Sequence, residues 1–303
     1  ISAAKEAIEK TALSKFEILS KDFLEKSEVW DINKIIKELH FPTDIDYLYR
    51  ARSDMSFRNW IVFLLSVMER KRIRKAEKSP DIKDVDIDKF EKTLSFHLTN
   101  AQKNVFSEIY SDLKRVEPMN RLLQGDVGSG KTVVALFAAY VVIKNGYKAA
   151  LMAPTEVLAN QHYRTAFEIF KKLNVPIYLL TGSANVEERN VFYNNSTSDE
   201  PALFIGTHTL FQEKTDFSKL GLIITDEQHR FGVNQRADLQ KKSILPNSLV
   251  LSATPIPRTL NLVKTGDLEL SCINELPPGR KPVETFVIDE RYEKRMLSFV
   301  VKE

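Results

Sequence analysis

The sequence predicts an α/β domain with a mostly parallel sheet over residues 93–275, preceded by an α-helical region over residues 1–92. Short β-rich runs alternate with helical stretches after residue 93, which is typical of βαβ units. A glycine-rich motif directly follows the first of these runs, where parallel sheets place their binding sites. The earlier residues contain no glycine before Gly125 and show helical spacing. The predicted strands are residues 121–124, 149–153, 177–180, 203–205, 222–225 and 249–252.

Three helices are expected in the first region. One carries apolar residues at helical spacing, a second follows Asp31 and ends at Pro42, and a third spans residues 56–78. The third helix ends in a basic run that either complements the helix dipole in solvent or contacts nucleic acid. The apolar residues of the first helix are Ile8, Leu13, Phe16 and Leu19, and the basic run contains Arg70, Lys71, Arg72, Arg74, Lys75 and Lys78.

Composition limits the classes of protein to consider. The chain has 44 basic and 41 acidic residues and a net charge of +3, so any nucleic-acid surface must be local. The single cysteine, Cys272, excludes an internal disulfide and a cysteine-based metal site, and we expect it to be a small buried residue in a reducing, cytoplasmic protein. Apolar runs such as residues 61–67 are too short to span a membrane, so no membrane partner is expected.

The strongest chemical signal is a phosphate-binding loop that fits the pattern G-x-x-x-x-G-K-[ST] between a strand and a helix. Its glycines allow backbone N–H groups to surround phosphate oxygens at the positive end of the following helix. Its lysine can reach the β- and γ-phosphates of ATP, and its threonine hydroxyl can bind Mg²⁺. The loop consists of Gly125, Asp126, Val127, Gly128, Ser129, Gly130, Lys131 and Thr132.

Two adjacent carboxylates follow the predicted strand at residues 222–225. Asp226 suits Mg²⁺ coordination through water, together with Thr132. Glu227 suits polarisation of an attacking water molecule, as general-base catalysis requires. With the phosphate loop, this pair predicts an ATP-hydrolysing site.

The residues Asp226-Glu227-Gln228-His229 resemble motif II of superfamily-two helicases, and other short segments resemble further helicase motifs in the expected order. The resemblance implies a RecA-like fold, a catalytic role for Lys131, Asp226, Glu227 and His229, and adenine binding by Leu98 and Gln102 in residues 96–102. It implies contacts with the DNA backbone at Pro154, Thr155, Thr181, Gly182, Gly206, Thr207 and His208. It also implies coupling between the ATP and DNA sites through Gln228, His229, Ser252 and Thr254.

Several of these residues also have a plain structural explanation. Thr155 and Thr207 both precede helical stretches, so they are expected to act as N-caps, which does not exclude phosphate contacts. His162 and His208 are expected to have structural or packing roles.

Longer segments narrow the resemblance to the bacterial RecG helicases, over residues 124–132, 226–236, 253–260 and 275–283. Such helicases remodel branched DNA with a wedge domain and two motor lobes. On this resemblance the chain begins after the wedge domain, and residues 276–303 are a linker and the start of a second lobe. The arginine that stabilises the γ-phosphate is then expected beyond Glu303. Two alternatives remain: a double-strand DNA translocase lobe of the Mfd type, and a nucleotide-dependent DNA-binding module without turnover.

Overall fold

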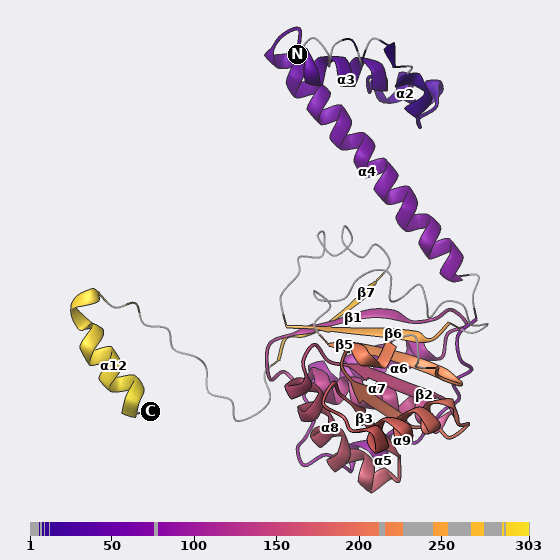
Figure 1. Cartoon of the computed structure of the whole chain (residues 1–303), viewed down its shortest axis with the longest axis vertical. Coiled ribbons are helices and arrows are strands. Elements are labelled where there is room, and N and C mark those ends of the chain that lie inside the picture. Colours follow the sequence, from indigo (N-terminus) through magenta and orange to yellow (C-terminus); the bar gives the residue numbers. More distant parts are fainter. Residues whose placement is uncertain are drawn as a thin grey trace.

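The computed structural model describes residues 6, 8, 10–11, 13–75, 78–211, 216–226, 245–253, 268–275, 287 and 289–302. A parallel sheet with flanking helices forms the centre of the α/β domain, and a long helix, α4, precedes it in the chain (Figure 1). This arrangement confirms the predicted fold class.

Within the described residues the sheet has seven strands in the order β3-β4-β2-β5-β6-β1-β7, and every pairing among them is parallel. Parallel strands are covered on both faces and therefore read as continuous apolar runs, which is why six of the seven were visible in the sequence. The strands are β1 (Asn120–Gly125), β2 (Lys148–Met152), β3 (Ile177–Leu180), β4 (Leu203–Gly206), β5 (Leu220–Asp226), β6 (Asn247–Ser252) and β7 (Glu269–Ile273).

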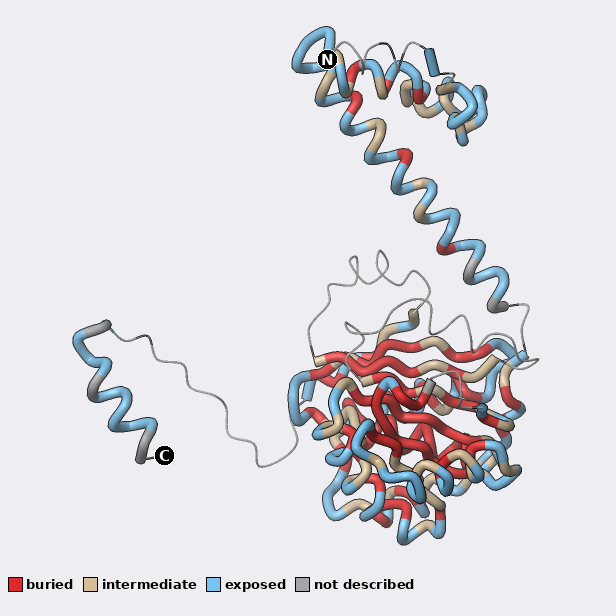
Figure 2. Tube along the Cα trace, viewed as in Figure 1, coloured by how far each residue is buried: buried red, intermediate tan, exposed pale blue. Residues whose placement is uncertain are grey.

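Helices cover both faces of this sheet. One core cluster joins α6, α7 and α8 to alternate residues of the strands, and a second joins α9 to the opposite face, where Phe192 packs edge-on against Phe204. Figure 2 shows the buried residues concentrated in the strands and in α7, which is apolar on all sides as a buried helix must be. The helices of this domain are α5 (Ile87–Glu91), α6 (Asn100–Leu113), α7 (Lys131–Lys144), α8 (Glu156–Phe170), η2 (Lys171–Leu173), α9 (Val186–Thr197) and η3 (His208–Phe211).

Strand β7 was not predicted. Among the described strands it lies at the edge of the sheet and pairs only with β1, and its polar residues broke the apolar run on which the other predictions depended. Ser271 and Ile273 face inward, whereas Cys272 between them is exposed, so the expectation of a buried cysteine was wrong. The cause is the alternation of side chains along a strand at the sheet edge.

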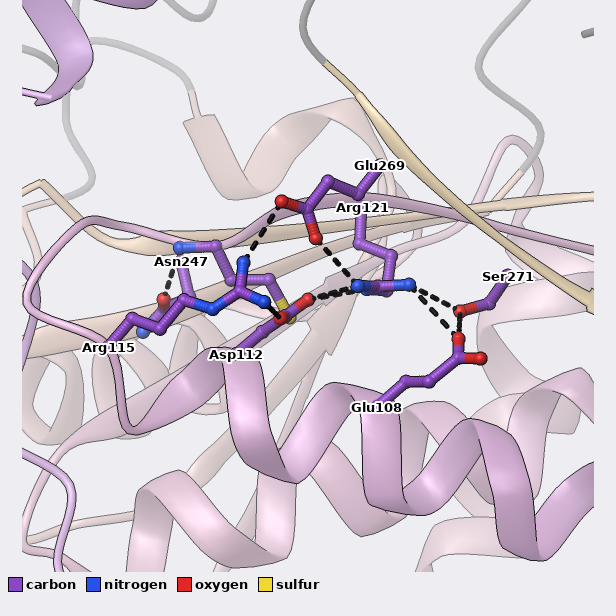
Figure 3. Close-up of polar contacts among 8 residues, drawn as sticks. Glu108, Asp112, Arg115, Arg121, Asn247, Glu269 and Ser271 are labelled. Carbon is purple, nitrogen blue, oxygen red and sulfur yellow. Dashed lines mark hydrogen bonds and ion pairs between the residues drawn. The ribbon is translucent and has the colours of Figure 1, made fainter.

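A polar network joins β7 and β1 to α6 near the amino-terminal ends of these two strands (Figure 3). Arg121 on β1 is buried, and its guanidinium donates to Asp112 and contacts Glu108 on α6. The same guanidinium donates to Ser271 and, at 2.7 Å, to Glu269 on β7. One side chain therefore joins three elements.

The preceding region contains η1 (Leu13–Phe16), α2 (Lys21–Ser27), α3 (Ile32–His40) and α4 (Ile45–Lys75). Asp31 caps α3, as its position in the sequence suggested. The first predicted helix is represented at residues 13–16 by a short 3₁₀ helix, and α4 begins at residue 45 rather than at the predicted residue 56. No helix among the described residues has the length and apolar character needed to cross a membrane.

The carboxyl-terminal segment contains η5 (Glu290–Tyr292) and α12 (Glu293–Lys302). Of the linker and second-lobe start expected over residues 276–303, the structure describes residue 287 and residues 289–302.

Candidate nucleotide and nucleic-acid site

The predicted chemical groups lie along one edge of the sheet, where the parallel strands end. Asp226 ends β5, Ser252 ends β6 and Gly125 ends β1. Leu251 pairs with both Asp226 and Leu123, so the end of β5 is level with Leu123, two residues before β1 ends at Gly125. One strand separates them, which places their backbones about 10 Å apart. That separation suits a metal ion held between a carboxylate and a phosphate loop.

The phosphate loop has the conformation that its glycines allow. Gly128 and Gly130 have φ values of 79° and 91°, a region that favours glycine. A Cβ atom on Gly125 would lie 2.6 Å from Ser129 Oγ, and one on Gly130 would lie 2.2 Å from Gln102 Nε2. The backbone is therefore packed too closely for other residues at both positions.

The side-chain hydroxyl of Ser129 is suited to binding a phosphate oxygen. Its side chain is buried, and Oγ has no hydrogen-bond partner among the described residues. A buried hydroxyl without a partner is unfavourable, and a phosphate oxygen would satisfy it. The loop thus fits the phosphates of a nucleotide.

Lys131 begins α7 at the end of the loop. Its Nζ atom donates to the carbonyl oxygens of Gly125, at 2.6 Å, and Asp126, at 2.8 Å. These two acceptors hold the ammonium group over the concave side of the loop, where it can reach phosphate oxygens.

Gln102 connects the predicted adenine-binding segment to the phosphate loop. Its Oε1 accepts from the N–H of Thr99 at 2.9 Å and completes a capping box at the start of α6. Its Nε2 donates to the carbonyl oxygen of Ser129 at 2.8 Å. Glu275, just after β7, accepts from the N–H of Ala101 in the same helix turn. Leu98 is buried beside this turn.

Asp226 is fixed by a neighbour that the sequence did not reveal as its partner. His162 on α8 lies with Nε2 at 2.8 Å from Asp226 Oδ2, and both side chains are largely buried. The two residues are 64 positions apart, so only the fold brings them together.

The predicted DNA contacts lie at the ends of β2, β3 and β4, on the other half of the same edge. Thr155, Gly182 and His208 are exposed and Pro154 is half-buried, whereas Thr181, Gly206 and Thr207 are buried. Thr155 caps α8 through a bond from the N–H of Leu158. The predicted capping role of Thr155 is therefore confirmed.

The buried members hold neighbouring loops together. Thr207 and Thr209 hydroxyls are 3.2 Å apart, and Thr209 donates to the carbonyl oxygen of Leu180. Glu156, which the sequence did not single out, accepts from the N–H and the hydroxyl of Ser183. The ends of β2, β3 and β4 thus form one connected surface.

Four predicted residues lie outside the described residues: Glu227, Gln228, His229 and Thr254. Ser252, the remaining predicted coupling residue, is buried at the end of β6 and pairs in register with Gln124 of β1.

Comparison with known proteins agrees with this geometry. The family model of the DEAD/DEAH box helicases matches residues 99–263. The chain belongs to the DEAD/DEAH box helicases. The region of this helicase that matches contains the phosphate loop, Asp226 and the predicted DNA contacts.

This helicase chain is similar to curated proteins named ATP-dependent DNA helicase RecG. It is 43% identical to that of Synechocystis sp. over 297 residues, and 44% identical to that of Aquifex aeolicus over 293 residues. These alignments cover 97% and 92% of this chain but 36% and 37% of the relatives. The helicase chain therefore spans little more than a third of their length.

A solved structure of RecG bound to a three-way DNA junction has the same fold, with a TM-score of 0.78 and 38% identity. The superposition covers 94% of this chain and 38% of that one. A DNA-bound structure of the helicase MrfA, with a TM-score of 0.50 and 18% identity, shares the fold alone.

Proposed function

We propose that this chain is the ATP-binding first motor lobe of an ATP-dependent DNA helicase of the RecG type that acts on branched DNA. The observation that carries the proposal is the shared sheet edge, with the phosphate loop and Asp226 on one half and the exposed Thr155, Gly182 and His208 on the other. The similarity to RecG helicases over nearly the whole chain supports the choice of substrate.

In this proposal the loop from Gly125 to Thr132 binds the triphosphate of ATP. Lys131 exchanges its two carbonyl acceptors for phosphate oxygens, and Ser129 gains a partner for its buried hydroxyl. Thr132 and Asp226 hold Mg²⁺, which would neutralise charge on the phosphates when bound. The buried hydroxyl of Ser129, which has no hydrogen-bond partner among the described residues, and the glycine loop favour a ligand with phosphate groups here.

Glu227 follows Asp226 directly, and we assign it the task of orienting the attacking water. We further assign coupling of hydrolysis to DNA movement to Gln228, His229, Ser252 and Thr254. Among these, Ser252 lies beside the phosphate-loop strand, since it pairs in register with Gln124. That position makes it suitable for transmitting a change at the nucleotide.

DNA is proposed to lie along the ends of β2, β3 and β4. The exposed N-cap of α8 at Thr155 and the exposed Gly182 present backbone and hydroxyl groups that contact phosphates without selecting a base sequence. Thr181, Gly206 and Thr207 are buried and are proposed to support these contacts from below. Branched DNA is preferred over a plain duplex because the relative of known structure is bound to a three-way junction.

The remaining parts of the machine are proposed to lie in a longer protein. A second motor lobe and a wedge domain would account for the relatives' additional length, since this chain covers 36% to 41% of them. We assign the protein to the bacterial cytoplasm, because the similar proteins are bacterial and are named as DNA helicases. The Mfd-type alternative is less favoured because the similar proteins are named RecG.

The test uses the full-length protein with junction DNA. Glu227→Gln should keep ATP affinity and lose turnover, whereas Asp226→Asn should weaken the Mg²⁺-dependent part of binding, because only the second change removes a metal partner. ATP binding and DNA-stimulated hydrolysis are measured for both variants. Equal turnover by Glu227→Gln and the wild type would contradict the assignment, and a wild type without turnover would favour a binding module.

A further inference from the structure

His162 contacts Asp226 from a helix that lies outside the motif II segment. Nε2 of His162 is 2.8 Å from Oδ2 of Asp226. A carboxylate can only accept in such a contact, so Nε2 carries the hydrogen and donates. The donor holds one oxygen of Asp226 in place and leaves the other for a metal-bound water.

Burial makes this contact rigid. The exposed fractions of the two side chains are 7% for His162 and 14% for Asp226, so solvent competes little for the hydrogen bond. Neighbouring turns of α8 are packed into the main core through Ala159 and Ala166, which fixes the helix against the sheet. The backbone of His162 is therefore held at a fixed place relative to the sheet, within reach of Asp226.

A packing histidine would be satisfied by any acceptor, but this one is directed at the residue proposed to serve Mg²⁺. Carboxylates that bind metals are usually oriented by a second hydrogen bond, and losing it typically costs about 10- to 100-fold in metal affinity or activity. Both oxygens of an unsupported Asp226 could rotate, which would spread the metal site over several geometries.

The same helix carries the exposed cap at Thr155, where DNA is proposed to bind. His162 lies two turns further along α8, so one rigid element joins the DNA side to the metal side of the sheet edge. A contact made at the DNA-facing end of α8 is therefore connected to Asp226 through this one helix and His162.

We propose that His162 is a positioning residue that orients Asp226 for Mg²⁺ and links the metal site to the DNA-facing end of α8. This inference rests on the proposed function, because it requires Mg²⁺–nucleotide binding at Asp226. Its primary test needs neither DNA nor hydrolysis, so a failure of this inference can be distinguished from a failure of the proposed function.

The experiment measures binding of a fluorescent ADP analogue to this chain as Mg²⁺ is raised from zero. In His162→Leu the affinity without Mg²⁺ should stay at the wild-type value, while the Mg²⁺ concentration at the midpoint should rise about 10- to 100-fold. His162→Gln, which keeps an N–H donor, should restore the midpoint to near the wild-type value. His40→Leu, at an exposed histidine of α3, is the matched control and should change nothing.

A Mg²⁺ midpoint in His162→Leu equal to that of the wild type would overturn the proposal. A midpoint raised as far in His162→Gln as in His162→Leu, with unchanged thermal stability, would overturn it as well. If His162→Leu does not fold, nitrogen NMR of the wild-type imidazole decides. The resonances of His162 should move when Mg²⁺ is added to the ADP complex, and unchanged resonances would overturn the proposal. A wild type in which Mg²⁺ does not affect nucleotide binding would instead contradict the proposed function.

Discussion

Gln102 shows how a single side chain can serve two parts of the site. It is buried, its oxygen completes the cap of α6, and its amide nitrogen supports the phosphate loop at Ser129. An amide has two hydrogens and two lone pairs, so one of each remains for an adenine edge. We propose that the residue both supports the loop and contacts the base.

Gln102→Ala should weaken binding of both ATP and GTP, and ATP more than GTP. Without the Gln102 amide, the Ser129 carbonyl loses its hydrogen-bond donor, which should cost roughly 1–3 kcal/mol of binding free energy for either nucleotide. Loss of the base contact should weaken the binding of ATP alone. Competition between the two nucleotides measures the difference. Equal losses would show that Gln102 braces the loop without reading the base.

At the scale of residues, local motifs were predictable and distant pairs were not. The phosphate loop and Asp226 were predicted from their residue types and their positions after apolar strands, and the structure places both at the same edge of the sheet. The pairing of His162 with Asp226 joins two different elements, and the sequence contains no periodic signal for it.

Among the elements, α6, β1 and β7 depend on one buried arginine. Burial raises the pKa of Asp112, although the charge of Arg121 acts in the opposite direction. Arg121 and Asp112 are 8% and 2% exposed, so the pair is almost fully removed from water. Removing one partner of such a pair typically costs about 3–5 kcal/mol.

Arg121→Met should therefore lower the free energy of unfolding by about 3 kcal/mol. The loss should grow as pH rises through the folded pKa of Asp112, which burial holds above its ordinary value, because the ionised carboxylate then lacks its guanidinium partner in the variant. Arg115→Ala, at a half-exposed arginine in the same network, is the control and should cost less than about 1 kcal/mol. Urea unfolding at several pH values measures both, and equal losses would contradict the central role of Arg121.

The sequence predicted the six strands with apolar runs, but it could not predict β7 or the network that holds it. An edge strand next to β1 can carry polar residues such as Glu269 and Ser271, because Arg121 supplies their partners after folding. Arg121 precedes these two residues in the chain by 148 and 150 positions, so no local pattern could indicate the contacts.

For the molecule as a whole, the helical region before the sheet is held together by an ion pair between Glu17 and Arg58. Glu17 accepts from the N–H groups of Leu19 and Ile32 and from buried Arg58 of α4. Burial raises the pKa of Glu17, but the hydrogen bonds and the charge of Arg58 together lower it by more, so the net shift of the pKa is downward. The region should thus lose stability in acid.

Both tryptophans, Trp30 and Trp60, lie in this region, so their fluorescence reports its unfolding alone. A lowered folded pKa means that the stabilisation by Glu17 is complete above the ordinary value of 4.5 and is lost as pH falls through the folded pKa. Glu17→Gln should remove this acid-dependent loss, whereas Glu25→Gln at an exposed position should keep it. An unchanged acid transition in Glu17→Gln would contradict the assignment.

Binding of Mg²⁺ and ATP at the edge formed by β1, β6 and β5 is the property on which the proposed function depends. The most direct measurement is calorimetric titration of Mg·ATP into the wild type and Lys131→Ala, with thermal unfolding of both as the control for folding. A hydrogen bond from a charged group such as the Lys131 ammonium is worth roughly 1.5–3 kcal/mol. The variant should therefore bind at least about 10-fold more weakly, while its unfolding temperature without nucleotide stays the same. Equal affinities for the two proteins, or a wild type that does not bind Mg·ATP, would contradict nucleotide binding at this edge.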